Sequence, residues 1–307
     1  MIDQDFELIT ILGPTASGKT SLAVALAEHV GGEIISADSR QIYQGMDIGT
    51  GKDLSEYGDI PYHLIDILDA GQIYGVGQFQ KDFHRVFQDI KTRKKIPILC
   101  GGTGLYIQSV LQNFEFTSVP RNPKLREAIE GKTIDELRKD FRNLPLHASF
   151  EADTSTHKRL VRAIEIAKWL ETHSLEKNTI KAPKSLTFGI HPTLDVRRAN
   201  ISARLRSRFE EGLVEEVKQL MAGGVSKEML IFYGLEYKFI TQYLQGDFDY
   251  KTCFQRLEIA IHQFAKRQMT YFRKMEKDGL SIHWLTEARF EERLAHVKTF
   301  FPIKFVP

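Results

Sequence analysis

The sequence predicts an α/β fold in which helices flank a parallel sheet and a smaller all-helical domain is inserted into the chain. Short apolar runs alternate with helical segments over residues 1–115 and again over residues 185–307, as expected for parallel strands joined by helices. Residues 116–184 break this alternation and show only helical patterns. We therefore predict a core made of residues 1–115 and 185–307, with residues 116–184 as a helical insertion domain.

The first strand, loop and helix carry the most specific motif in the chain. An apolar run at residues 7–12 is followed by a glycine-rich loop and then by an Ala- and Leu-rich helix that starts near Ser17. The loop matches the pattern G-x-x-x-x-G-K-[ST], in which backbone N–H groups and the helix N-terminus bind a polyphosphate. The lysine of this pattern contacts the outer phosphate, and the following hydroxyl ligates Mg²⁺. We therefore predict a P-loop NTPase-like fold, a Mg²⁺ held by Thr20, and phosphate binding by Gly13, Pro14, Thr15, Ala16, Ser17, Gly18, Lys19 and Thr20.

A polar segment follows the second predicted strand, residues 33–37. Asp38 and Ser39 come directly after this strand, and ligands of open α/β sheets bind at the carboxyl ends of strands. A carboxylate at this place can act as a general base if it reaches the nucleophile. The alternative is that Asp38 only caps the turn after the strand. Arg40 and Gln41 are candidates for contacting a nucleotide edge or a phosphate.

A second glycine-rich turn follows the predicted strand at residues 96–100. The helix before this strand, residues 77–95, has an aromatic stripe that predicts packing on the sheet. The turn, GGTG, precedes another helix and therefore favours anions. Within it, the hydroxyl of Thr103 can donate to a phosphate or to a leaving-group oxygen. An ordinary strand-to-helix connection remains open as an alternative.

The inserted region contains three predicted helices, at residues 122–130, 133–143 and from about residue 156 to residue 170. The second starts with a capping box formed by Thr133 and Glu136. The third has a buried apolar stripe, and Lys158, Arg159 and Arg162 lie off it, which predicts a basic ridge that binds phosphates. Salt bridges to helix neighbours such as Glu165 are the alternative.

The last part of the chain returns to strand and helix. A strand at residues 185–191 precedes a helix from about residue 197, which places Arg204 and Arg208 on one face, where two guanidinium groups can clamp a diphosphate. Gly212 weakens this helix and predicts a bend in it. A long helix at residues 250–275 and a strand at 281–285 complete the predicted sheet.

Composition and charge limit the partners. The net charge is +2, but residues 1–100 carry 9 basic and 14 acidic side chains, whereas residues 154–210 carry 12 basic and 5 acidic ones. This asymmetry predicts a polyanionic partner for the basic segment.

No apolar run approaches the ~20 residues of a membrane span, and the N-terminus lacks the pattern of a secretory signal, so we expect a cytoplasmic protein without membrane contact. Cys100 and Cys253 are expected to be free buried thiols.

Three segments together resemble the bacterial tRNA dimethylallyltransferase family: GPTASGKT at residues 13–20, SADSRQIYQGMDIGTGKD at 36–53 and GGTGLYI at 101–107. Residues 157–166, 203–217 and 265–274 are also similar to that family, whereas IFYGLEYK at 231–238 departs from its usual pattern. Enzymes of this family use Mg²⁺ to transfer a five-carbon group from dimethylallyl diphosphate to N6 of adenosine-37 in tRNA. The resemblance therefore implies this reaction, the anticodon stem-loop as partner, and a monomer.

The resemblance also implies a role for each matching residue. The implied catalytic residues are Asp38 as the base, Thr103 near the bridging oxygen, and Lys19 and Arg208 on the diphosphate. The implied tRNA contacts are Asp38, Ser39, Arg40, Gln41, Thr103, Lys158, Arg159, Leu160, Val161 and Arg162. From the motifs alone, a P-loop small-molecule kinase and an adenylate isopentenyltransferase acting on free AMP remain as alternatives.

Overall fold

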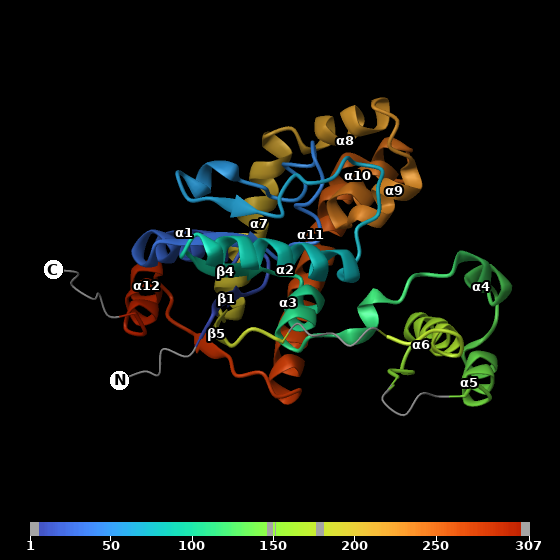
Figure 1. Cartoon of the computed structure of the whole chain (residues 1–307). Helices are drawn as coiled ribbons and strands as arrows, with labels where there is room; N and C mark the ends of the chain where they lie inside the picture. Colours follow the sequence, from blue (N-terminus) through green and yellow to red (C-terminus); the bar gives the residue numbers. More distant parts are fainter. Residues whose placement is uncertain (1–5, 146–149, 151, 176–180, 302–307) are drawn as a thin grey trace. The chain divides into compact units, whose positions relative to one another are not determined.

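The computed structural model describes residues 6–145, 150, 152–175 and 181–301, and the chain divides into two compact units (Figure 1). One unit comprises Met1–Gln112 and Ala182–Pro307, and the other comprises Asn113–Lys181. The first unit contains a sheet of six parallel strands, in the order β3-β2-β4-β1-β5-β6. The α/β prediction is therefore confirmed. The strands are β1 (Leu8–Leu12), β2 (Gly32–Ser36), β3 (Tyr62–His63), β4 (Ile96–Gly101), β5 (Ser185–Ile190) and β6 (His283–Leu285).

The order of the strands decides which loops become neighbours. Strand β4 lies between β1 and β2, although it follows both of them in sequence. All three strands are parallel, so their carboxyl ends lie at the same edge of the sheet. The loops that follow β1, β2 and β4 therefore meet at one place, as expected for a ligand site in an open α/β sheet.

Helices cover both faces of the sheet because alternate strand residues point in opposite directions. Leu8 and Leu12 of β1 belong to the core under α2, α3, α10 and α11, whereas Ile9 and Ile11 belong to the core under α1 and α12. The helices of this unit are α1 (Lys19–Val30), α2 (Val76–Thr92), α3 (Gly104–Leu111), α7 (Leu194–Glu210), α8 (Leu213–Ala222), α9 (Lys227–Tyr233), α10 (Leu235–Leu244), α11 (Tyr250–Lys277) and α12 (Phe290–Lys298). The sequence interpretation contained no equivalent of α9, α10 or α12, and it did not separate α8 from α7.

Local sequence signals account for several of these elements. The aromatic stripe of α2 is buried at Phe79, Phe83 and Phe87, as predicted. Helix α1 starts at Lys19 rather than near Ser17, because Gly18 adopts a left-handed conformation (φ 78°) at the N-cap. The bend predicted at Gly212 separates α7 from α8. Both cysteines are free and buried, as expected.

In the described part of the second unit the regular structure is entirely helical. Its α-helices are α4 (Pro123–Ala128), α5 (Ile134–Arg142) and α6 (His157–Leu170). The predicted capping box is present at the start of α5, where the side chains of Thr133 and Glu136 each bond the other residue's backbone N–H. Glu165 of α6 is buried and accepts hydrogen bonds from Arg126 at 2.7 Å, which joins α4 to α6.

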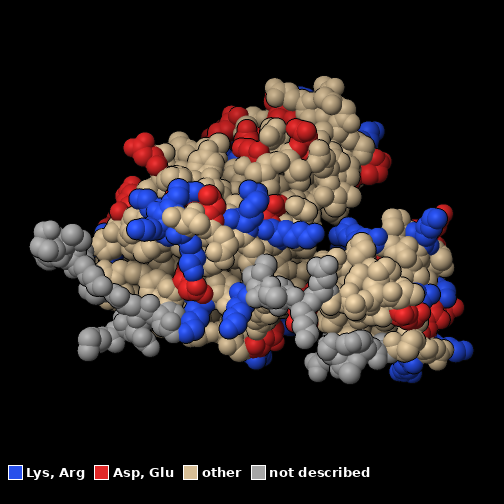
Figure 2. Space-filling view, viewed as in Figure 1, with Lys and Arg blue, Asp and Glu red and all other residues tan. Residues whose placement is uncertain are grey.

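Basic and acidic side chains are unevenly spread over the visible face of the first unit. In Figure 2, Lys and Arg side chains gather over α2 and the residues that follow it. At the C-terminal end of α2, two cations are paired with carboxylates: Lys91 with Glu7 at 2.5 Å and the C-cap Arg93 with Glu33 at 2.7 Å. None of the helices among the described residues is long and apolar enough to cross a membrane.

Candidate active site

Side chains and backbone groups join the three loops at the carboxyl edge of the sheet. The hydroxyl of Thr103, after β4, accepts a hydrogen bond from the N–H of Ser39, after β2, at 3.0 Å. The N–H of Thr103 donates to the carbonyl of Ala37 at 3.1 Å. The loops after β2 and β4 are therefore held together at the residues that the sequence singled out.

Gln268 of α11 joins the phosphate loop to the GGTG turn. Its Oε1 accepts from the N–H of Thr15 at 2.9 Å, and its Nε2 donates to the carbonyl of Gly102 at 2.9 Å. One buried amide side chain thus fixes the spacing of two glycine-rich loops. The sequence interpretation missed this residue, because a glutamine in a long amphipathic helix carries no signal of its own.

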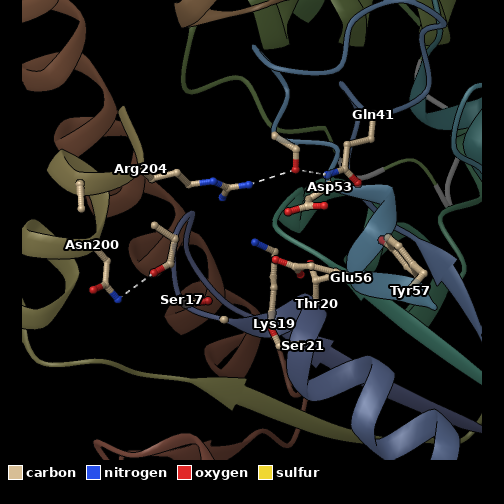
Figure 3. Close-up of a pocket in the computed structure, with 14 residues that line it drawn as sticks. Ser17, Lys19, Thr20, Ser21, Gln41, Asp53, Glu56, Tyr57, Asn200 and Arg204 are labelled. Carbon is tan, nitrogen blue, oxygen red and sulfur yellow. Dashed lines mark hydrogen bonds between the residues drawn. The ribbon is translucent and has the colours of Figure 1, made fainter. Parts of the chain in front are cut away.

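Two adjoining cavities lie beside these loops. The larger, of about 280 Å³, is lined by residues 16–21 of the phosphate loop and helix α1, together with Asp53, Glu56, Asn200 and Arg204 (Figure 3). The smaller, of about 70 Å³, is lined by Lys19, Asp38 and Thr103. Both cavities are lined by Lys19, Thr20, Gln41, Gly51, Tyr57 and Arg204.

Four cationic side chains line the cavities, and three of them are Lys19, Arg204 and Arg208. Within the part of the chain that the structure describes, Nζ of Lys19 makes only a long hydrogen bond of 3.4 Å, to the carbonyl of Pro14. Arg204 donates to the carbonyl of Gly51 at 3.0 Å, whereas Arg208 donates to the carbonyl of Gly49 at 3.3 Å. Burial lowers the pKa of the Lys19 ammonium, and burial together with the Arg208 charge lowers the pKa of Arg204 to about 10. Crowded, partly desolvated cations of this kind favour an anionic ligand.

The segment between β2 and the 3₁₀ turn at Leu54–Tyr57 is held by two charged groups that the sequence did not reveal. The buried carboxylate of Glu216 in α8 accepts from the N–H groups of Asp47, Ile48 and Gly49 at 2.8, 2.7 and 3.0 Å. The ammonium of Lys52 is also buried, and it pairs with Asp47 at 2.7 Å. These contacts hold the backbone in place around Gly49 and Gly51, whose carbonyls accept the hydrogen bonds from the two arginines.

Asp38 and its neighbours line the smaller cavity. One carboxylate oxygen of Asp38 accepts from the N–H of Arg40 at 3.0 Å, so the residue does cap its turn, as the alternative interpretation proposed. The guanidinium of Arg40 lies 5.0 Å from the ring centre of Phe264 and 3.1 Å from Glu236. Glu236 also pairs with Arg208 at 3.1 Å. The segment that departs from the family pattern therefore supplies a carboxylate that orients two arginines.

In the helical unit, the exposed members of the 158–162 run are Lys158 and Arg159. Arg159 pairs with Asp153 at 2.7 Å, and both side chains are about half exposed. These two cations lie on the surface of α6.

The other three residues of this run serve the structure of the unit. Leu160 is fully buried and Val161 nearly so, and both belong to the apolar core of the unit rather than to its surface. Arg162 is half-buried, pairs with Glu165 at 3.2 Å and donates to the carbonyl of Val119 at 2.6 Å. Arg162 therefore fits the salt-bridge alternative, because its guanidinium bonds to groups of the helical unit itself.

Residues 41–275 match the family model described as IPP transferase, and residues 6–60 match the one described as isopentenyl transferase. The chain belongs to the IPP transferase family. It is 52% identical to tRNA dimethylallyltransferase 1 of Parabacteroides distasonis over 92% of this chain and 93% of that protein. It is 48% identical to tRNA dimethylallyltransferase 2 of Bacteroides fragilis over 96% of this chain and 97% of that protein. The resemblance inferred from the motifs is confirmed.

Solved structures of IPP transferase family proteins share the fold. The full-length tRNA isopentenylpyrophosphate transferase of Bacillus halodurans matches with a TM-score of 0.71 and 30% identity, covering 96% of this chain and 95% of that one. The corresponding enzyme of Staphylococcus epidermidis matches with a TM-score of 0.68 and 31% identity, covering 95% and 97%. Both matches extend over nearly the whole of each chain.

Proposed function

We propose that this IPP transferase family protein transfers the dimethylallyl group from dimethylallyl diphosphate to N6 of adenosine-37 in tRNA and releases diphosphate. The observation that carries the proposal is that Lys19, Asp38 and Thr103 line the same cavity, so that the anion-binding loop and a carboxylate border one space. The high identity to proteins named tRNA dimethylallyltransferase supports the same reaction.

The larger cavity suits the diphosphate of the donor. The phosphate loop offers backbone N–H groups at the start of α1, Lys19 and Arg204 supply positive charge to this cavity, and Arg208 lines the adjoining smaller one. The hydroxyl of Ser17 is buried and has no hydrogen-bond partner within the described residues, so a phosphate oxygen would satisfy it.

The oxygen donors at this cavity also suit Mg²⁺. Thr20, Asp53 and Glu56 line it, and the hydroxyl of Thr20 is the donor that the loop motif assigns to the metal. Among the described residues there is no cluster of three or more His, Cys, Asp or Glu that would hold a metal alone, so phosphate oxygens would complete the coordination. When bound, Mg²⁺ would neutralise negative charge on the diphosphate.

The residues account for each bond that changes. The bond between the allylic carbon and the bridging oxygen breaks, and both electrons leave with the diphosphate. Lys19, Arg204, Arg208 and the hydroxyl of Thr103 stabilise the charge that develops there. N6 of the adenine forms the new C–N bond, and Asp38 accepts the proton that N6 loses.

The acceptor base has to leave its stack in the anticodon loop to enter the smaller cavity. Ser39, Arg40 and Gln41 line that cavity beside Asp38 and are proposed to contact the base. Lys158 and Arg159 of the helical unit are proposed to contact phosphates of the anticodon stem-loop, because they are the exposed cations of that run. A monomer acting in the cytoplasm is part of the same proposal.

A substrate matrix tests the proposal. The protein is incubated with Mg²⁺ and either dimethylallyl diphosphate or ATP, and with either tRNA or AMP as acceptor. We expect the five-carbon group to appear on tRNA only with dimethylallyl diphosphate, and nuclease digestion with mass spectrometry should locate it at position 37. A matched tRNA with guanosine at that position is the control. Consumption of ATP alone, or prenylation of AMP alone, would overturn the proposal.

A further inference from the structure

The C-terminal helix α12 makes a polar contact with the phosphate loop. Arg293 lies on α12, which packs on α1 through Leu294 and Val297. Its Nη1 donates to the carbonyl of Ser17 at 3.1 Å, and its Nη2 donates to the carbonyl of Ala288 at 2.9 Å. Two backbone carbonyls thus fix the plane of the guanidinium.

The contact acts on the peptide group that joins Ser17 to Gly18. A trans peptide directs its C=O and N–H to opposite sides. With the Ser17 carbonyl directed at Arg293, the N–H of Gly18 is directed away from that guanidinium, and Gly18 lines the larger cavity. Hydrogen bonding at the carbonyl also polarises the peptide, which strengthens its N–H as a donor.

The guanidinium is also an uncompensated charge behind the loop. Its Nη1 lies 3.8 Å from the position that a Cβ would take on Gly18. Within the described residues Arg293 pairs with no carboxylate, and its Nε is buried without a hydrogen-bond partner. A cation this close to the loop increases its affinity for anions without touching them.

We propose that Arg293 is a positioning residue for the prenyl diphosphate, acting through the Ser17–Gly18 peptide. The inference rests on the proposed use of the phosphate loop for the donor. Arg293 does not line either cavity, and it lies outside the residues that match the two family models, 41–275 and 6–60.

Binding of inorganic pyrophosphate to the full-length protein tests this role. Arg293→Met keeps the aliphatic packing of the side chain but removes the donors and the charge. We expect R293M to weaken pyrophosphate binding about tenfold, the scale of a charge-assisted hydrogen bond, as measured by calorimetry in the presence of Mg²⁺. The KM for dimethylallyl diphosphate should rise in parallel, while the Kd for tRNA should stay unchanged.

Arg289→Met is the matched control, since Arg289 caps the same helix but is largely exposed and pairs with Glu292. R289M should bind pyrophosphate like the wild type. If R293M does not fold, Arg293→Gln replaces it, because the amide can still donate to one carbonyl, and weaker pyrophosphate binding is again expected.

The outcomes separate this inference from the proposed function. A folded R293M or R293Q protein that binds pyrophosphate as tightly as the wild type would overturn the positioning role, as would an equal rise in the Kd for tRNA. Absence of tRNA prenylation by the wild type would instead overturn the proposed function. A purely structural role would lower the melting temperature and leave the affinity of the folded protein unchanged.

Discussion

Replacing Gly51 by alanine would displace the two arginines that face the phosphate loop. Gly51 has a φ of +65°, and a Cβ on it would overlap Nη2 of both Arg204 and Arg208. The Cβ would also lie 2.9 Å from Cζ of Arg204. Ordinary contact between such atoms needs ~3.5 Å, so the guanidinium groups would have to move by roughly 1 to 1.5 Å.

The expected effects follow from this displacement. The left-handed conformation costs an alanine about 1–2 kcal/mol, and disturbing the two arginine hydrogen bonds adds about 1 kcal/mol each. The free energy of unfolding should therefore fall by about 3 kcal/mol. Because a 1 Å misplacement at a reacting centre can cost ~10²-fold in rate, kcat/KM for dimethylallyl diphosphate should fall by about that factor.

Gly45→Ala is the matched control for backbone strain. Gly45 has a φ of +69°, but no heavy atom lies within 4 Å of the position that a Cβ would take on it. G45A should lose about 1–2 kcal/mol of stability and keep its kcat/KM. Thermal unfolding and steady-state prenylation of tRNA would measure both quantities. If G51A kept a kcat/KM within threefold of G45A, the two arginines would not act on the donor.

Four further predictions concern other groups. Asp38→Asn should lower kcat by ~10²-fold with the donor KM unchanged, and an unchanged kcat in steady-state assays would remove Asp38 as the base. Because burial lowers the pKa of both Lys19 and Arg204, positive charge beside the phosphate loop is lost at lower pH than for exposed side chains of these types. Pyrophosphate binding should therefore weaken toward alkaline pH, as measured by calorimetry at several pH values. An affinity that did not change with pH would contradict this loss of positive charge. Replacing Lys158 and Arg159 together by Ala should weaken tRNA binding and reduce its salt slope. Arg162→Ala should instead lower the melting temperature, and an unchanged melting temperature would contradict its structural role.

The sequence by itself determined the features that depend on local order. The spacing of Gly13 and Gly18 before Lys19 predicts the phosphate loop because backbone geometry and helix start are local properties. The aromatic stripe of α2 and the capping box at Thr133 follow from helical periodicity in the same way. Each of these features involves residues that are close in sequence, so their spacing along the chain determines their spacing in space.

Only the tertiary structure decided which distant groups meet. The position of β4 between β1 and β2 brings Thr103 beside Asp38 and Lys19, and no local pattern specifies that order. Gln268 and Arg293 reach the phosphate loop from more than 250 residues away, through hydrogen bonds to backbone groups. Backbone N–H and carbonyl groups occur at nearly every residue, so the type of a residue does not indicate which distant side chain will bond to its backbone.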